Sequence, residues 1–279
     1  MKTVSTADWT LTGEGGRGQT FCHPDLPDVL LKLNFERFPE SLAEQEFATA
    51  RRIASLGIPS PEVYELVTDG NGRFGMLLEK LHGKKSFASI VAQEPERADE
   101  MAQRFARSAK ALFSTPCPTS EFESVTEHMQ KVILACDYYP QKIKDGICSI
   151  LAGIEPSTTC LHGDFHFGNI VECTKGDVWI DCGEFGYGNP LVDISQSMMI
   201  AGYFSDERAR NEYHMDAALN KKFYSLFEKH FFGNLSDAAM EDIRRRIRPL
   251  FLVRFALYGA MDKNILNSVR TTLEKALGM

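Results

Sequence analysis

The residues that decide the fold are His162-Gly163-Asp164-Phe165-His166-Phe167-Gly168-Asn169. They are followed by Ile180-Asp181 and then by Gly188-Asn189-Pro190-Leu191-Val192-Asp193. Two short apolar runs, 169–173 and 178–181, flank the polar turn 174–177, and this pattern predicts a β-hairpin. An acid, an amide five residues later and a second acid at the end of the hairpin are therefore expected in loops and at strand ends.

Three oxygen-bearing side chains in this stretch have the types and the spacing that phosphoryl transfer to a hydroxyl requires. The reaction needs a carboxylate that accepts the hydroxyl proton and oxygen ligands that fix Mg²⁺ on a triphosphate. Asp164 is therefore expected to be the catalytic base, and Asn169 and Asp181 are expected to hold Mg²⁺. Taken one by one, Asp164 and His166 are equally typical of turn caps, and Asp181 of a strand end. Their combination favours the catalytic interpretation.

The first eighty residues predict an antiparallel sheet interrupted by one helix. Alternating and β-branched patterns predict strands at 9–12, 19–22, 29–33, 62–67 and 74–78. Between the third and fourth strands, Ser41 and Glu44 are spaced as a capping box at the start of a helix, and Gly57 with Pro59 is expected to end it. A five-stranded sheet with one helix is the simplest arrangement of these elements.

Two features of this N-terminal part point to an anionic ligand. Gly13, Gly15, Gly16 and Gly18 join the first two strands, where backbone amides can approach phosphate oxygens, although a plain glycine-rich hairpin turn has the same composition. Lys32 is the single charge in an apolar strand and needs anionic partners, unless it only protects a sheet edge. We expect it to pair with Glu46, which shares a helix face with apolar residues, rather than with Glu44 on the opposite face.

The rest of the chain predicts mostly helices, and its composition excludes several classes of protein. Helical periodicity covers 95–113, 121–135, 141–151, 190–201, 207–231 and 238–258. The net charge of −7 argues against nucleic-acid binding. The absence of an apolar leader and of a long apolar run argues against export and against a membrane span, so a cytoplasmic location is expected. Seven dispersed cysteines are expected to be reduced thiols.

These motifs together resemble the aminoglycoside phosphotransferase and choline kinase family, which is similar to protein kinases. The resemblance implies a two-lobed protein-kinase-like fold of the α+β class. In this fold, residues 1–80 would form a small antiparallel-sheet N-lobe with one helix, and residues 81–279 would form a larger, mostly helical C-lobe. It also implies that His162, His166 and Asp193 support the catalytic loop. The backbone of Glu79, Lys80 and Leu81 is expected to bind the adenine edge of ATP.

Two positions differ from those of related enzymes; the first removes no metal ligand, and the second bears on the substrate. Cys182 follows the metal-binding aspartate where aromatic residues are common, and Gly163 stands where protein kinases carry an arginine. A small molecule with a hydroxyl group, aminoglycoside-, choline- or sugar-like, is therefore expected as phosphate acceptor. A minimal protein kinase and a nucleotide-binding pseudo-kinase scaffold remain alternatives. Neither the acceptor's identity nor the oligomeric state follows from the sequence.

Overall fold

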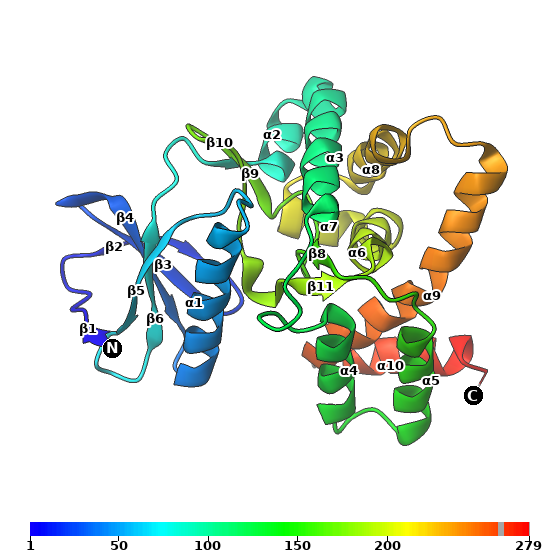
Figure 1. Ribbon diagram of the computed structural model, residues 1–279, viewed down its shortest axis with the longest axis horizontal. Coiled ribbons are helices and arrows are strands. Elements are labelled where there is room, and N and C mark those ends of the chain that lie inside the picture. The colour runs from blue at the N-terminus through cyan, green and yellow to red at the C-terminus, as the bar shows by residue number, and fades with distance from the viewer. Residues whose placement is uncertain (262–264, 279) are drawn as a thin grey trace. The chain divides into compact units, whose positions relative to one another are not determined.

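The N-terminal part of the chain forms a six-stranded sheet with one helix (Figure 1). The computed structural model describes residues 1–261 and 265–278. The strands are β1 (Lys2–Thr3), β2 (Thr10–Glu14), β3 (Gly18–His23), β4 (Leu26–Asn34), β5 (Val63–Thr68) and β6 (Phe74–Glu79), in the order β1-β5-β6-β4-β3-β2. All neighbours are antiparallel except β1 and β5. The five predicted strands are confirmed as β2 to β6, and the two-residue β1 was too short to leave a sequence pattern.

Helix α1 (Glu40–Ser55) packs against β5 and β6 of this sheet. Its buried face consists of Ala43, Glu46, Thr49 and Ile53. The predicted capping box is wrong, because the helix begins at Glu40 after Pro39 and no side chain caps its N-terminus. The expected end is confirmed: Gly57 has a φ of 71°, a left-handed conformation that glycine adopts without strain.

The predicted hairpin is confirmed as β9 (Ile170–Cys173) and β10 (Gly176–Trp179). The strand β7 (Lys85–Ser86) pairs with the outer side of β9 to form a three-stranded sheet. The chain divides into two units, and the hairpin belongs to the first. Unit 1 comprises Met1–Phe87 with Asn169–Gly183, and unit 2 comprises Ala88–Gly168 with Glu184–Met279.

Unit 2 is mostly helical. Its helices are α3 (Ala98–Ser114), α4 (Val125–Ala135), α5 (Gln141–Ala152), α6 (Pro190–Tyr203), α7 (Asp206–Tyr213), α8 (Ala217–Phe232), α9 (Asp237–Met261) and α10 (Leu266–Ala276). A short helix, α2 (Phe87–Gln93), and a single 3₁₀ turn, η1 (Pro95–Arg97), precede α3. The strands β8 (Thr159–Leu161) and β11 (Gly186–Gly188) form a two-stranded sheet.

An aromatic cluster in unit 2 anchors the loop that follows β8. Phe165 is fully buried, and its ring stacks on Phe105 with the ring centroids 4.8 Å apart. Phe223 and Phe227 of α8 pack against the same ring of Phe105. Because Phe165 follows Asp164 directly, its burial fixes the backbone of the loop while Asp164 stays at the surface of the core.

Three expectations for the helical part need correction. The helix expected at 207–231 is two helices, because His214 adopts a left-handed φ of 58° between α7 and α8. The helix expected from Pro95 begins as the 3₁₀ turn η1, and α2 and α10 were not expected at all. Within the described part of the chain, no helix combines the length and apolar character that crossing a membrane requires.

Candidate functional site

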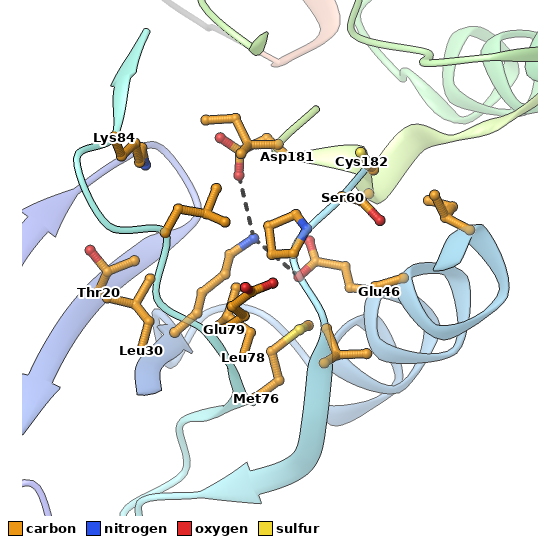
Figure 2. A pocket seen from close by; sticks show the side chains of 18 residues that line it. Thr20, Leu30, Glu46, Ser60, Met76, Leu78, Glu79, Lys84, Asp181 and Cys182 are labelled. Atoms are coloured by element: carbon orange, nitrogen blue, oxygen red, sulfur yellow. Dashed lines mark ion pairs between the residues drawn. The ribbon is translucent and has the colours of Figure 1, made fainter. Parts of the chain in front are cut away.

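Unit 1 contains a pocket between its sheet, α1 and the end of the β9–β10 hairpin (Figure 2). Apolar side chains, among them Leu30, Met76 and Leu78, form much of its wall. Its volume of about 180 Å³ is far larger than the roughly 10–15 Å³ that one water molecule needs. The pocket can therefore admit a ligand with an apolar ring system.

A lysine lies between two carboxylates in this pocket. The ammonium of Lys32, on β4, is 3.6 Å from Glu46 Oε2 and 3.8 Å from Asp181 Oδ1, the ion pairs drawn as dashed lines in Figure 2. Both distances exceed the 2.7–2.9 Å of a direct charge-assisted hydrogen bond. Lys32 is thus oriented by opposite charges and still has donors for an anion. Of the two glutamates considered from the sequence, Glu46 lies beside Lys32, and Glu44 is exposed.

The β9–β10 hairpin brings Asn169 and Asp181 to its open end. The Ile180 N–H donates to the Asn169 carbonyl at 2.9 Å, which continues the strand pairing by one residue. Asn169 is buried, whereas the Asp181 side chain is 61% exposed and directed at the pocket. Asp181 has a φ of 54°, a left-handed conformation that few residues other than glycine adopt. Such local strain is typical of functional positions.

The glycines between β2 and β3 differ in what they contact. A Cβ on Gly18 would lie 2.2 Å from the Leu33 carbonyl, and one on Gly13 would lie 2.9 Å from Thr20 Oγ1, so internal packing accounts for both. A Cβ on Gly15 or Gly16 would meet no atom within 4 Å. The absence of side chains at these two positions therefore leaves an open backbone surface.

The segment from Glu79 to Leu81 ends the central strand β6 at the pocket. The Glu79 N–H donates to the Glu62 carbonyl at 2.8 Å, and the Lys80 N–H donates to the Asp28 carbonyl at 2.9 Å. Glu79 and Leu81 line the pocket, and Lys80 is not among the lining residues. The Leu81 N–H makes no bond to another described residue, so it is the amide of this segment that can serve a ligand.

Cys182 also lines the pocket, beside Asp181. Burial and then the Asp181 charge raise the pKa of the Cys182 thiol to about 12. The thiol is therefore protonated at neutral pH and acts as a small wall residue.

In unit 2, Asp164 lies between a histidine and a glutamine. Gln196 Nε2 donates to Asp164 Oδ1, and His166 Nε2 is 3.6 Å from Asp164 Oδ2. Burial alone would raise the pKa of Asp164, but the electrostatic interactions with His166 and His162 and the hydrogen bond from Gln196 hold that pKa well below its usual range. The Asp164 side chain is still 41% exposed. It is therefore an accessible carboxylate at neutral pH.

Asp193 ties α6 to the loop that carries Asp164. Its carboxylate accepts the His162 N–H at 2.6 Å and the Gly163 N–H at 3.1 Å, and it is fully buried. Burial raises the pKa of Asp193 to about 6, while the Arg254 charge and the two backbone bonds oppose that rise. Gly163 has a φ of 84°, and a Cβ there would lie 2.1 Å from the Glu184 carbonyl. No side chain fits at position 163.

Two residues that contact this loop, Arg254 and Gln196, were not found from the sequence. Arg254 of α9 is buried and donates to the carbonyls of Gly163 at 3.0 Å and Val192 at 2.7 Å. It also lies 3.8 Å from Asp193 Oδ1. A lone charge inside the apolar run 250–257 was the available signal, the same signal that singled out Lys32.

We expect Arg254→Met to lower the free energy of unfolding by about 3–5 kcal/mol at pH 8, because it leaves a buried carboxylate without its cation. Urea denaturation followed by circular dichroism measures this change. The exposed Arg270→Met is the matched control and should change stability by no more than about 0.5 kcal/mol.

The stability defect of Arg254→Met should depend on pH in one direction. The folded pKa of Asp193, about 6, exceeds the roughly 3.9 of an unfolded aspartate, so its contribution to stability is lost as pH rises through 6. Removal of Arg254 raises the folded pKa further and extends that loss to higher pH. The defect should therefore be larger at pH 8 than at pH 5, and an equal defect at both would show that Asp193 and Arg254 are not coupled.

The described residues contain no ready-made metal site. No group of three or more His, Cys, Asp or Glu side chains lies close enough together in the described ranges to hold an ion. Asn169 and Asp181, at the open end of the hairpin, both carry side-chain oxygens, the ligand type that Mg²⁺ prefers.

The comparisons with known proteins found one matching family model and a set of solved structures. The model of the phosphotransferase enzyme family matches residues 23–221. No match was found among curated protein sequences.

Solved structures with this fold cover nearly the whole chain. A thermostable mutant of aminoglycoside phosphotransferase APH(4)-Ia has a TM-score of 0.66 at 11% identity, with 98% of this chain and 93% of that chain covered. A choline/ethanolamine kinase family protein from Mesorhizobium loti has a TM-score of 0.59 at 16% identity, with 98% and 87% covered. The amicoumacin kinase hAmiN has a TM-score of 0.57 at 16% identity, with 99% and 90% covered. The predicted kinase-like fold is confirmed.

Proposed function

Because this chain belongs to the phosphotransferase enzyme family, we propose that it transfers the γ-phosphoryl group of ATP to a hydroxyl of a small molecule, with Mg²⁺. The observation that carries the proposal is the pocket in which Lys32 lies between Glu46 and Asp181. A cation held by two carboxylates at distances too long for direct hydrogen bonds is suited to receive phosphate oxygens.

Different residues of the pocket would bind different parts of the nucleotide. Leu30, Met76 and Leu78 would give the adenine base an apolar surface, and the Glu79 carbonyl and the Leu81 N–H would bind its edge. Lys32 neutralises phosphate charge, and Glu46 orients Lys32. Gly16, whose N–H makes no backbone hydrogen bond to a described residue, leaves room for a phosphate to approach, whereas the Gly15 N–H donates to the Gly18 carbonyl at 2.9 Å. Internal hydrogen bonds occupy the Lys80 amide, so Lys80 has no part in this proposal.

Asn169 and Asp181 would hold Mg²⁺ through their side-chain oxygens. Mg²⁺ commonly takes one or two protein oxygens and fills its octahedron with phosphate and water, so two ligands at one end of a hairpin fit this ion. When bound, MgATP supplies the phosphoryl group and the cation that offsets its charge. The exposed Asp181 carboxylate and the nearby Lys32 provide the fixed charges.

Asp164 would accept the proton of the acceptor hydroxyl. Its lowered pKa keeps it ionised, and its partial exposure leaves it open to an acceptor. His162, His166 and Asp193 would support this aspartate through the loop. His166 Nδ1 accepts the Gly168 N–H at 3.1 Å, which leaves Nε2 as the nitrogen that faces Asp164.

The acceptor class is proposed from the neighbours in fold. Solved complexes of APH(4)-Ia contain hygromycin B, and a complex of APH(2'')-IIa contains streptomycin. Gly163, where no side chain fits, is consistent with a small-molecule kinase because protein kinases carry at this position an arginine that binds a phosphorylated activation loop.

A screen for ADP release tests the proposed function. Purified protein with ATP and Mg²⁺ would be incubated with aminoglycosides, choline, ethanolamine and hydroxylated sugars, one at a time. At least one acceptor should raise ADP release well above the rate without acceptor, and the phosphorylated product should appear by mass spectrometry. Labelled ATP with a mixed protein extract is the control. Labelled protein bands, or no ATP binding at all, would contradict the proposal.

Lys32→Ala should raise KM for ATP and lower kcat, so that kcat/KM falls by roughly 10²-fold. The reason is that the phosphates of ATP lose the cation that neutralises their charge. Steady-state ADP formation at varied ATP measures both constants. Lys85→Ala, an exposed lysine on β7 outside the pocket, is the matched control. If Lys32→Ala behaves like Lys85→Ala, the proposed phosphate contact is wrong.

A further inference from the structure

Gln196 is a buried residue of α6 whose amide bonds to Asp164. Its side chain is 3% exposed, and Nε2 donates to Asp164 Oδ1. The carboxylate can only accept, so the amide nitrogen must face it. Gln196 Oε1 is buried and accepts no hydrogen bond from the described residues. The bond to Asp164 is therefore the hydrogen bond that the described residues give this buried amide.

Helix α6 holds successive residues of the loop from one face. Asp193 accepts the N–H groups of His162 and Gly163, Gln196 donates to Asp164, and Ser197 Oγ donates to the Phe165 carbonyl at 3.0 Å. Positions 193, 196 and 197 are three and four residues apart and therefore share a face of the helix. Of the three, Gln196 alone contacts the side chain of the loop rather than its backbone.

We propose that Gln196 is a positioning residue for phosphoryl transfer: its amide fixes the orientation of the Asp164 carboxylate. This inference rests on the proposed function of Asp164 as the base. With Oδ1 bound to Gln196, the carboxylate presents Oδ2 as the oxygen for the acceptor proton. A base held in the reactive orientation accelerates the reaction more than the same base free to rotate.

Other charged or titratable groups act on Asp164 from the surrounding elements. They are His162 and His166 of the loop, Asp193 of α6, Tyr213 of α7, and Arg254 and Tyr258 of α9. Burial raises the pKa of both tyrosines, so they stay neutral. Gln196 is the partner that has no proton to titrate. Its removal therefore changes the orientation and the ionisation of Asp164 without adding a titration of its own.

The test compares Gln196→Met, which keeps length and apolar volume, with the wild type. Asn220→Leu is the matched control, since Asn220 is also a buried amide, with its Nδ2 bound to the Ile200 carbonyl and its Oδ1 without a described partner. Two readouts are used: the pH profile of ADP formation from ATP with water as acceptor, and the carboxyl ¹³C titration of aspartate-labelled protein. Asp164→Asn assigns the Asp164 resonance.

Gln196→Met should lower the rate of ADP formation by roughly 10- to 100-fold, with KM for ATP within about twofold of wild type. Its activity should fall toward acidic pH, where the wild type stays level, and the Asp164 resonance should titrate at higher pH. Gln196→Glu places a second carboxylate beside Asp164. It should shift both the activity profile and the titration of the Asp164 resonance to still higher pH. Asn220→Leu should leave pH profile and resonance unchanged.

The inference is overturned if Gln196→Met matches Asn220→Leu in rate, in pH profile and in the Asp164 titration. If the wild type neither binds ATP nor forms ADP, the proposed function fails. Even then, an unchanged Asp164 titration in Gln196→Met would reject the role of Gln196, and a shifted one would support it.

Discussion

Asp164→Asn should lower kcat by roughly 10²- to 10⁴-fold, the usual contribution of a positioned base, while the affinity for ATP changes little. The amide keeps the shape of the side chain but cannot take the proton of the acceptor. ATP affinity should persist because the pocket that carries Lys32 lies wholly in unit 1, whereas Asp164 belongs to unit 2. Steady-state kinetics and calorimetric titration with ATP measure the two quantities separately.

Asp242→Asn is the matched control for this prediction. Asp242 is an exposed aspartate of α9 in the same unit, and its loss should leave kcat unchanged. A variant Asp164→Asn that loses ATP binding and keeps turnover would contradict its assignment as the base.

Asp181→Asn should lower activity by roughly 10²- to 10³-fold, since it removes the charge proposed to hold Mg²⁺ and one of the two carboxylates beside Lys32. The amide still offers an oxygen, so loss of charge is the main change. Asn169→Ala removes a neutral ligand and should cost less, and excess Mg²⁺ or Mn²⁺ should partly restore its activity. ADP formation over a range of metal concentrations measures these effects.

The two changes should be less than additive when combined, because both residues are proposed to hold the same ion. The double variant therefore tests whether Asn169 and Asp181 share one cation. Fully additive penalties, with no recovery at high metal concentration, would show that they do not.

Local patterns predicted the sheet of unit 1 and the hairpin well, and they failed where tertiary contacts set the structure. Strands β2 to β6 carry β-branched and apolar patterns bounded by turn residues, so each could be found alone. The capping box at Ser41 failed because the helix begins two residues earlier, with Pro39 as its N-cap. The break at His214 depends on a left-handed residue that no glycine or proline announces.

In the candidate site too, the residues marked by local patterns were predicted, and those that depend on tertiary contacts were not. Lys32, Asp164, Asn169 and Asp181 were found because an unusual residue type or a short motif marks each of them. Gln196 and Arg254 reach the loop from α6 and α9, more than thirty residues away along the chain. A single sequence does not show which helix face will lie against that loop, so such partners become visible only in three dimensions.

The division of unit 1 into two separate chain segments has a consequence for biosynthesis. Strand β7 has its partner in β9, and Lys32 has one of its two carboxylates in Asp181, both from the segment Asn169–Gly183. A ribosome that adds roughly 5–20 residues per second would synthesise Met1–Phe87 several seconds before the segment Asn169–Gly183. The nascent chain therefore exposes an incomplete pocket during translation, and a fragment that ends at Phe87 cannot form the lysine site whatever its stability.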